Sequence, residues 1–448
     1  LFVVLSLSLC VSASSCRRKT PIRPHIVTDR VRTVCPPRLL GLAGLLGGYA
    51  LAGGGLWVWA ALDGLPAWAA AGAATALAAL GGLWVIRKLL RWRMWPCLRH
   101  FLLQQPERVS RGETTDVCFL FVDHFEPDYG QADAAQQLER VRRWEAAYGR
   151  AIAGRRDSDG RPPQHTWFFP VALNDPCVRP VVASWPGRGW GEIEYHLHHD
   201  DRPDMPADQI EAQVRNDLAD LRAMGALSGG RYGFVHGMFA LAGGDERWCR
   251  CQDELDVLLR TGCYADFTFP SLGSPAQPPQ INTLYRARST GGRRPYETGS
   301  PVQAGRDGHE EGLLMLGGPM HFGLYPRLCD DAHVEPAHLP HPRRIARWLD
   351  CRVHVPGRPN WVFISIHSHT ARQDAQNALF GGPMQRLWRA LEERFQCRRL
   401  WRLHYVTARE AYNIVRAAEA GCDGNAGTFR DFELPPPANR TCRTEERS

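Results

Sequence analysis

The sequence predicts an α/β protein, and three observations support that prediction. Apolar runs of β type alternate with amphipathic helical segments, several of these runs end in histidine or carboxylate residues, and two long uncharged runs precede them. Alternation of this kind is typical of a parallel sheet, and the number of units favours a closed, distorted (β/α) barrel over residues 114–420. The uncharged runs predict an N-terminal transmembrane helical hairpin in front of the barrel.

The hairpin would consist of residues 39–62 and 67–86, separated by a short Asp-Gly-Leu-Pro turn. At 1.5 Å per residue the two runs would span about 36 and about 30 Å, enough to cross a bilayer core of about 30 Å. Basic residues flank the hairpin in segment 1–38, which has a signal-like start, and in the connector 87–113. The positive-inside rule then predicts an integral protein of a bacterial inner membrane, with the large domain in the cytoplasm. The alternative is a pair of buried helices in a soluble protein.

The charge distribution argues against a nucleic-acid partner. The formal net charge is +7, but the residues before position 110 carry +10, so the large domain is slightly acidic at −3. A domain without a basic stripe gives no support to nucleic-acid binding. The fourteen cysteines show no repeating interval, and we interpret them as mostly reduced thiols.

Seven strands and six helices are expected within the barrel. The expected strands lie at 116–125, 165–171, 191–200, 231–241, 264–270, 360–369 and 398–407. The expected helices lie at 134–152, 208–225, 251–262, 343–351, 381–396 and 408–420. Thr407 and Glu410 have the spacing of a capping box before the last helix. The Gly- and Pro-rich stretch 271–312 predicts an irregular insertion with a hairpin, and 421–448 predicts a flexible tail.

One expected strand concentrates side chains that bind metals. Residues 191–201 hold three histidines, two glutamates and two aspartates. Because side chains alternate across a strand, five of these residues share one face: Glu192, Glu194, His196, His198 and Asp200. Imidazoles two positions apart lie about 7 Å from each other, within reach of one metal ion. The alternative is a solvated edge strand.

Other expected strands also end in polar residues. The first ends in Asp123 and His124, with Glu126 just beyond. Two later strands end in His236 and in the pair His367 and His369. Because catalytic groups of α/β barrels lie at the carboxyl ends of strands, we expect these residues to converge with His196 and His198 on one metal or catalytic site. A structural role for each residue is the alternative.

These segments resemble motifs of the polysaccharide deacetylase family, the NodB-like carbohydrate esterases. The stretch "FLFVDHFEP" resembles the first family motif, and "EIEYHLHHDD" resembles the second, which carries two metal histidines. "YGFVHGMFAL" and "CYADFTFPS" resemble strands of the substrate groove, and "FISIHSHTA" resembles the strand with the catalytic histidine. The resemblance covers about 116–420 and implies a NodB-like deacetylase barrel.

The resemblance implies a role for each matching residue. Asp123 would be the general base, and either His367 or His369 would be the general acid. The implied metal ligands, most simply for zinc, are His124, His196, His198 and Asp200. The implied substrate-binding residues are Glu126, His236 and Asp266. The chain departs from the family pattern at His124, which replaces an aspartate, and in its groove strand, which lacks an Arg-x-Pro sequence.

The expected function is therefore that of a membrane-anchored, metal-dependent hydrolase. It would remove acetyl groups from a glycan or a lipid-linked sugar precursor, in contact with polysaccharide-assembly proteins. A metal-free glycosidase on the same barrel is one alternative, with four candidate carboxylates: Asp123, Glu126, Asp200 and Asp266. A non-catalytic glycan-binding or scaffold subunit of a polysaccharide export machine is the other alternative.

Overall fold

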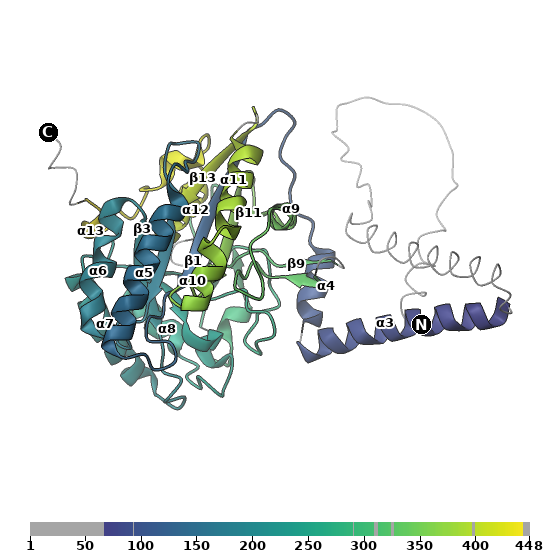
Figure 1. Cartoon of the computed structure of the whole chain (residues 1–448), viewed down its shortest axis with the longest axis horizontal. Coiled ribbons are helices and arrows are strands. Elements are labelled where there is room, and N and C mark those ends of the chain that lie inside the picture. The colour runs from purple at the N-terminus through teal and green to yellow at the C-terminus, as the bar shows by residue number, and fades with distance from the viewer. Residues whose placement is uncertain are drawn as a thin grey trace, which may run out of the picture.

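The computed structural model describes residues 67–92, 94–289, 291–308, 312–323, 327–396 and 399–441. They form a mixed α/β structure around one large sheet, and helix α3 extends away from the rest (Figure 1). The helices are α3 (Ala67–Arg91), α4 (Trp95–Leu103), α5 (Ala134–Ile152), α6 (Arg179–Ser184), α7 (Ala207–Ala223), α8 (Glu254–Thr261), α9 (Pro342–Cys351), α10 (Gln373–Phe380), α11 (Pro383–Phe395), α12 (Ala408–Glu419) and α13 (Ala438–Thr441).

The central sheet has eleven strands, and most neighbouring pairs in it are parallel. Its strands are β1 (Thr115–His124), β2 (His165–Phe169), β3 (Gly191–Leu197), β4 (Tyr232–His236), β5 (Cys263–Asp266), β6 (Tyr285–Ala287), β7 (Gly299–Pro301), β8 (Leu313–Met315), β11 (Val353–Val355), β12 (Arg358–Ser368) and β13 (Trp401–Val406). A separate pair consists of β9 (His321–Phe322) and β10 (Cys329–Asp330).

The sheet does not close into the expected barrel. Its order runs β11-β12-β1-β2-β3-β4-β5-β8-β6-β7, and the two end strands do not pair with each other within the described residues. Each edge carries an antiparallel addition, β11 on β12 and the β6–β7 pair on β8. A barrel requires its end strands to meet in register, and these additions occupy the edges that would have to meet. The prediction of an α/β fold with a parallel sheet is confirmed, whereas the closed barrel is not.

Strand β13, which is the last strand in the sequence, pairs with β1, which is the first strand described. It pairs with positions 115–120 of β1, whereas β2 pairs only with positions 122–124. One edge of β1 therefore pairs with β12, and the other edge pairs first with β13 and then with β2. This arrangement separates the amino end of β2 from β1 and leaves the carboxyl ends of the strands aligned at one edge of the sheet.

The two faces of the sheet are covered by different helices. Phe119 and Phe121 of β1 pack in the same apolar core as α5 and α11. Leu120 and Val122 face the other way and pack in the same core as α12. Every residue of α12 is buried, and its capping box between Thr407 and the side chain of Glu410 is formed as predicted.

Polar residues of β3 also face α12. The guanidinium of Arg409 donates to the Glu192 carboxylate at 2.8 and 3.0 Å, and the exposed fraction of both side chains is only 1%. Glu194 accepts hydrogen bonds from the Gly233 N–H and from the Tyr264 hydroxyl. The carboxylates at the amino end of the ligand-rich strand thus hold the fold together.

The predicted insertion contains an antiparallel pairing of the expected kind, whereas the segment 421–441 packs on the domain. Within 271–312, β6 pairs with β7 and with β8, which extends the sheet by a hairpin-like unit. From 421 to 441 the chain packs on the domain, because Leu434 and Arg430 are buried and α13 ends this segment. This stretch differs from the expected flexible tail, because Arg409 donates hydrogen bonds to its carbonyl groups at Arg430 and Leu434.

Only the second half of the predicted transmembrane hairpin lies within the described residues. The first apolar run, 39–62, and the segment 1–38 lie outside the described residues, and the second run, 67–86, lies in α3. Of the helices described by the structure, none combines the length and the apolar character that a membrane crossing requires. Within the connector, α4 packs on the domain through Phe101, whose ring lies 5.6 Å from that of Phe322.

Candidate active site

The carboxyl ends of β1, β3 and β12 lie at the same edge of the sheet, because these strands run parallel. A cavity of about 1160 Å³ opens at this edge. Five of the predicted site residues line it: His124, Glu126, His198, Asp200 and His369. A volume of this order is typical of a site for a small molecule or an oligosaccharide unit.

Three side-chain atoms meet at the wall of the cavity. The Nε2 atoms of His196 and His198 lie 2.6 Å apart, and both lie within 3.2 Å of the Glu126 Oε1 atom. On its other side, the His198 Nδ1 atom lies 2.7 Å from the Asp200 Oδ1 atom. We call His124, Glu126, His196 and His198 the open cluster, because three of its four members line the cavity.

The electrostatics of the open cluster favour a cation. Burial alone would raise the pKa of Glu126, but hydrogen bonds from His196 and His198 lower this pKa well below its usual range. Burial lowers the pKa of His196 to about 4. Burial also acts to lower the pKa of His198, but hydrogen bonds to Asp200 and Glu126 outweigh it and raise this pKa to about 9. The anionic Glu126 thus attracts positive charge, which a proton on His198 or a divalent ion can supply.

His124 adds a ligand atom that has no other use in the fold. Its Nε2 atom is buried and has no hydrogen-bond partner among the described residues. Possible ligand atoms of His124, Glu126 and His196 all lie within 4.8 Å of one another. Imidazole nitrogens and carboxylate oxygens are the usual ligands of catalytic zinc, and such sites keep a position open to the substrate. The donor set therefore fits a divalent metal ion at the cavity.

A histidine–carboxylate pair stands beside the open cluster. The Glu335 Oε1 atom lies 2.8 Å from the His369 Nδ1 atom and accepts the His369 backbone N–H at 2.9 Å. The ring centroids of His369 and His124 are 4.8 Å apart. Burial acts to lower the pKa of His369, but the Glu335 carboxylate outweighs it and raises this pKa. His369 is thus suited to carry a proton at the cavity.

Asp123 does not reach the cavity, although the family resemblance implies that it is the base. It is fully buried, with Oδ2 2.8 Å from His165 Nε2 and Oδ1 accepting the Thr370 N–H at 2.8 Å. Because His124 and Asp123 are adjacent in a strand, their side chains project from opposite faces. The structure therefore places Asp123 on the face covered by α5, where it connects β2 with the turn after β12.

Three further predicted residues also lie away from the cavity. His367 is buried and stacks on His333, with ring centroids 4.7 Å apart. Asp266 is buried and accepts hydrogen bonds from the hydroxyl and the N–H of Thr268 at 2.7 and 3.1 Å. His236 is buried as well, in a second cluster of metal-binding residues. Of the two candidate acids, the structure places only His369 at the cavity.

The rim of the cavity combines aromatic, apolar and basic groups. Tyr129 is half exposed, and the guanidinium of Arg372 lies 4.6 Å from its ring centroid. Met238 and Phe239 both have positive φ angles, 54° and 56°, which are strained for residues with side chains. Backbone strain of this kind is concentrated at functional sites, because the surrounding structure must enforce it.

Two partners of the predicted residues were not anticipated from the sequence. Glu335, which orients His369, lies in an irregular stretch between β10 and α9. His165, which pairs with Asp123, begins the short strand β2. The local sequence "DDAHVE" before α9 is rich in ligand-type residues, and it is the one local indication of Glu335.

Neither the known protein families nor the curated proteins include a match to this sequence. Among solved structures, the chain is similar to one described as "putative polysaccharide deacetylase from Mycobacterium smegmatis". The sequence identity is 14% and the TM-score is 0.38, with 70% of this chain and 94% of that chain covered. The similarity is distant, and no conclusion about function depends on it.

Proposed function

We propose that this chain is a metal-dependent hydrolase that removes acetyl groups from a glycan or glycolipid. The observation that carries the proposal is the open cluster, in which two imidazole nitrogens and one carboxylate oxygen meet within 3.2 Å beside a large cavity. Titratable groups gathered at a solvent-accessible wall are typical of functional sites and are not a usual source of fold stability.

His124, His196 and Glu126 would hold the metal ion, and His198 would complete the set from the cavity side. A divalent ion at this position polarises an acyl carbonyl and lowers the pKa of water. Asp200 holds the ring of His198 through Nδ1, which directs Nε2 toward the other ligands. In this arrangement Asp200 orients a ligand and would not bind the metal ion itself.

His369 would transfer the proton. The Glu335 carboxylate can only accept at Nδ1, so Nδ1 carries a hydrogen and Nε2 is the atom that exchanges a proton with the reactants. The pair can take a proton from the attacking water and return it to the leaving amine or alcohol. Of the two histidines that the family resemblance implies as acid, the geometry favours His369.

The rim of the cavity suits a sugar. The half-exposed ring of Tyr129 offers apolar surface for a pyranose, and the exposed Arg202 also lines the cavity, where its guanidinium can bind hydroxyls. An acetylated glycan chain is therefore the proposed substrate class, and polysaccharide-assembly proteins are the proposed partners. A lipid-linked sugar would present the same acetylated ring to the site.

The first test is acetate release by the purified full-length chain. Acetylated oligosaccharides are incubated with the protein as isolated, after metal removal by chelation, and after zinc is restored. We expect acetate release that chelation abolishes and zinc restores, and that is lost in His124→Ala and His196→Ala. His341→Asn is the matched control, because this exposed histidine caps α9 away from the cavity.

Two results would contradict the proposal. Acetate release that persists after metal removal would exclude a metal-dependent reaction. Cleavage of glycosidic bonds by the metal-free protein would favour a glycosidase, for which only Glu126 and Asp200 among the four candidate carboxylates line the cavity.

A further inference from the structure

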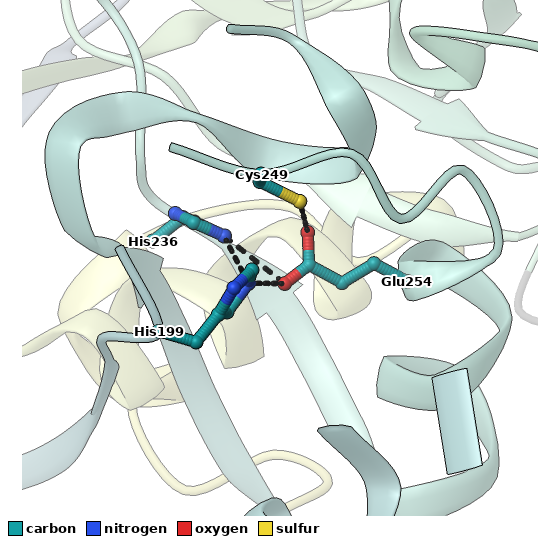
Figure 2. Close-up of side chains that lie close together, drawn as sticks. All are labelled: His199, His236, Cys249 and Glu254. Atoms are coloured by element: carbon teal, nitrogen blue, oxygen red, sulfur yellow. Dashed lines mark hydrogen bonds and ion pairs between the residues drawn. The ribbon is translucent and has the colours of Figure 1, made fainter. Parts of the chain in front are cut away.

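A second cluster of metal-binding side chains lies on the other side of the β3 terminus. It consists of His199, His236, Cys249 and Glu254, which we call the closed cluster (Figure 2). All four residues are buried, with exposed fractions of 0 or 1% for the side chains of the two histidines and Glu254. None of them lines the cavity of the open cluster.

The four side chains come from separate parts of the chain and point toward one another (Figure 2). His199 follows the end of β3, and His236 is the last residue of β4. Cys249 lies in the loop between β4 and α8, and Glu254 is the first residue of α8. Because no two of them are helix neighbours, only the tertiary structure brings them together.

Distances within the closed cluster are those of a ligand set. The Nε2 atoms of His199 and His236 lie 3.2 Å apart, and they lie 3.4 and 3.1 Å from the Glu254 Oε1 atom. The Cys249 Sγ atom lies 3.8 Å from the other carboxylate oxygen of Glu254. The four ligand atoms all lie within 4.8 Å of one another.

Hydrogen bonding alone does not satisfy these atoms. The Nδ1 atom of His236 faces the Gly237 carbonyl oxygen, which can only accept, so Nδ1 carries the hydrogen of the neutral ring. The His236 Nε2 atom then presents a lone pair to the Glu254 Oε1 atom, which is itself an acceptor and has no hydrogen-bond partner among the described residues. The His236 Nε2 lone pair can accept a hydrogen bond from His199 Nε2 at 3.2 Å, but the Glu254 oxygen beside it still lacks a donor among the described residues. A metal ion or an added proton between these atoms would offset the repulsion of the facing electron pairs.

Among the described residues, no arginine or lysine pairs with Glu254. In the described part of the chain, its ion-pair partners are His199 and His236, and its second oxygen accepts the Ala242 N–H at 2.6 Å. By contrast, the equally buried Glu192 is paired with Arg409. When both histidines are neutral, Glu254 is a buried carboxylate without a counter-ion, which is costly, so a bound cation would stabilise this region.

We propose that the closed cluster binds a structural zinc ion through four ligands, His199, His236, Cys249 and Glu254. Two imidazoles, one thiolate and one carboxylate are ligands that zinc accepts in tetrahedral geometry, and a site without access to solvent is typical of structural zinc. The hydrogen bond from His236 Nδ1 to the Gly237 carbonyl is the outer contact that orients such a ligand. This inference does not depend on the proposed hydrolase activity.

The zinc ion would tie the loop between β4 and α8 to the end of β3. That loop carries Met238 and Phe239, the strained residues at the rim of the cavity. It also carries Gly237, where an added Cβ atom would lie only 2.5 Å from the His198 ring. The closed cluster would therefore hold the wall against which His198 of the open cluster rests.

Cobalt substitution tests the proposal, because only the closed cluster contains a thiolate. The full-length chain is produced in minimal medium with cobalt as the added transition metal, and its cobalt content and near-ultraviolet absorption are measured. We expect a sulfur-to-cobalt charge-transfer band that disappears in Cys249→Ser. Cys251→Ser is the matched control, since this neighbouring cysteine belongs to no described cluster, and the band should remain.

The outcomes separate the two clusters. His196→Ala should lose cobalt from the open cluster and keep the band, whatever the fate of the hydrolase activity. Cobalt bound without a charge-transfer band, a band that survives Cys249→Ser, or a protein without cobalt would each overturn the proposal.

A second measurement covers the case in which Cys249→Ser does not fold. X-ray absorption at the zinc edge of the His196→Ala variant should show one sulfur neighbour at about 2.3 Å beside lighter atoms. A spectrum with no sulfur neighbour would overturn the proposal without any change at Cys249.

Discussion

The open and closed clusters differ in solvent access although each contains one of two adjacent histidines. His198 contributes to the open cluster at the cavity, and His199 contributes to the closed cluster in the interior. Both clusters combine histidine with glutamate, but only the closed one adds a thiolate and excludes solvent. If both proposals hold, position relative to the cavity, rather than ligand type alone, separates the reactive site from the structural one.

The buried carboxylates sharpen this comparison. Glu192 is balanced by Arg409, Glu254 faces two histidines and a thiol, and Asp266 has only Thr268. Burial raises the pKa of Asp266 to about 7, so this group takes a proton where no cation is at hand. The three residues therefore differ in how their charge is neutralised: an arginine for Glu192, a proton for Asp266 and, under the proposal above, a metal ion for Glu254.

The largest expected effect concerns the open cluster. His369→Ala should reduce kcat for acetate release by about 10²- to 10⁴-fold, because it removes the proton carrier. The melting temperature should stay nearly unchanged, since the His369 side chain is 21% exposed and lies at the cavity. Steady-state kinetics and thermal unfolding on the same preparation check this. Activity within a factor of about two of the unaltered chain would exclude His369 from the reaction.

A substitution at Arg409 tests the arginine-balanced carboxylate. Arg409→Met should lower the free energy of unfolding by about 3 kcal/mol, because the buried Glu192 would lose its main partner. Because Arg440 also pairs with Glu192, the expected loss of unfolding free energy is at the lower end of the range for broken buried ion pairs. Chemical denaturation measures the effect. The double variant with Glu192→Gln should recover part of the loss, and a double variant as unstable as the single one would contradict this account.

Chelation should separate the two clusters in time. Acetate release should disappear first, because the cavity gives the chelator access to the open cluster. The melting temperature should fall later, as zinc leaves the buried closed cluster, by an amount that corresponds to about 2–4 kcal/mol of lost binding free energy. Activity and thermal unfolding are followed in parallel during incubation. Simultaneous loss of both properties would show that the two clusters behave as one site.

The smallest effect is expected at Asp266. The folded pKa of about 7 lies above the unfolded value of about 3.9, so the folded state binds the extra proton between these values. Stability contributed by this group is therefore present at acidic pH and declines as the pH rises through about 7. Asp266→Asn should make the loss of unfolding free energy between acidic and alkaline pH smaller by about 1–2 kcal/mol. Urea denaturation at pH 5 and pH 8 measures it, and an unchanged pH profile would contradict the assignment.

The sequence predicted the local structure better than the site. The periodic spacing of apolar residues predicts helix α5, and the spacing of Thr407 and Glu410 predicts the capping box. Both are present. Strand alternation also placed Glu192, Glu194 and His196 on one face. The same alternation puts Asp123 on the face opposite His124, whereas the family resemblance implies that both act at one site, and Asp123 follows the alternation.

The rest depended on long-range contacts. Cys249 has no local pattern that distinguishes it from the other cysteines, and only the fold brings it to His199 and His236. Barrel closure likewise depends on what covers the edges of the sheet, and the short strands β7 and β11 are too brief to be predicted from composition. Contacts between residues far apart in sequence leave little trace in either period or spacing.

The late pairing of β1 has a consequence for synthesis on the ribosome. Positions 116–120 of β1 pair with β12 on one edge and with β13 on the other, so both partners of this stretch emerge long after β1 itself. Until then this apolar stretch exposes both edges to other nascent chains, which is a hazard for aggregation. This part of the fold should therefore form only after β13 has emerged and should depend on holding chaperones until then. Protease-resistant domains in ribosome-bound chains that end before residue 395 would argue against this dependence.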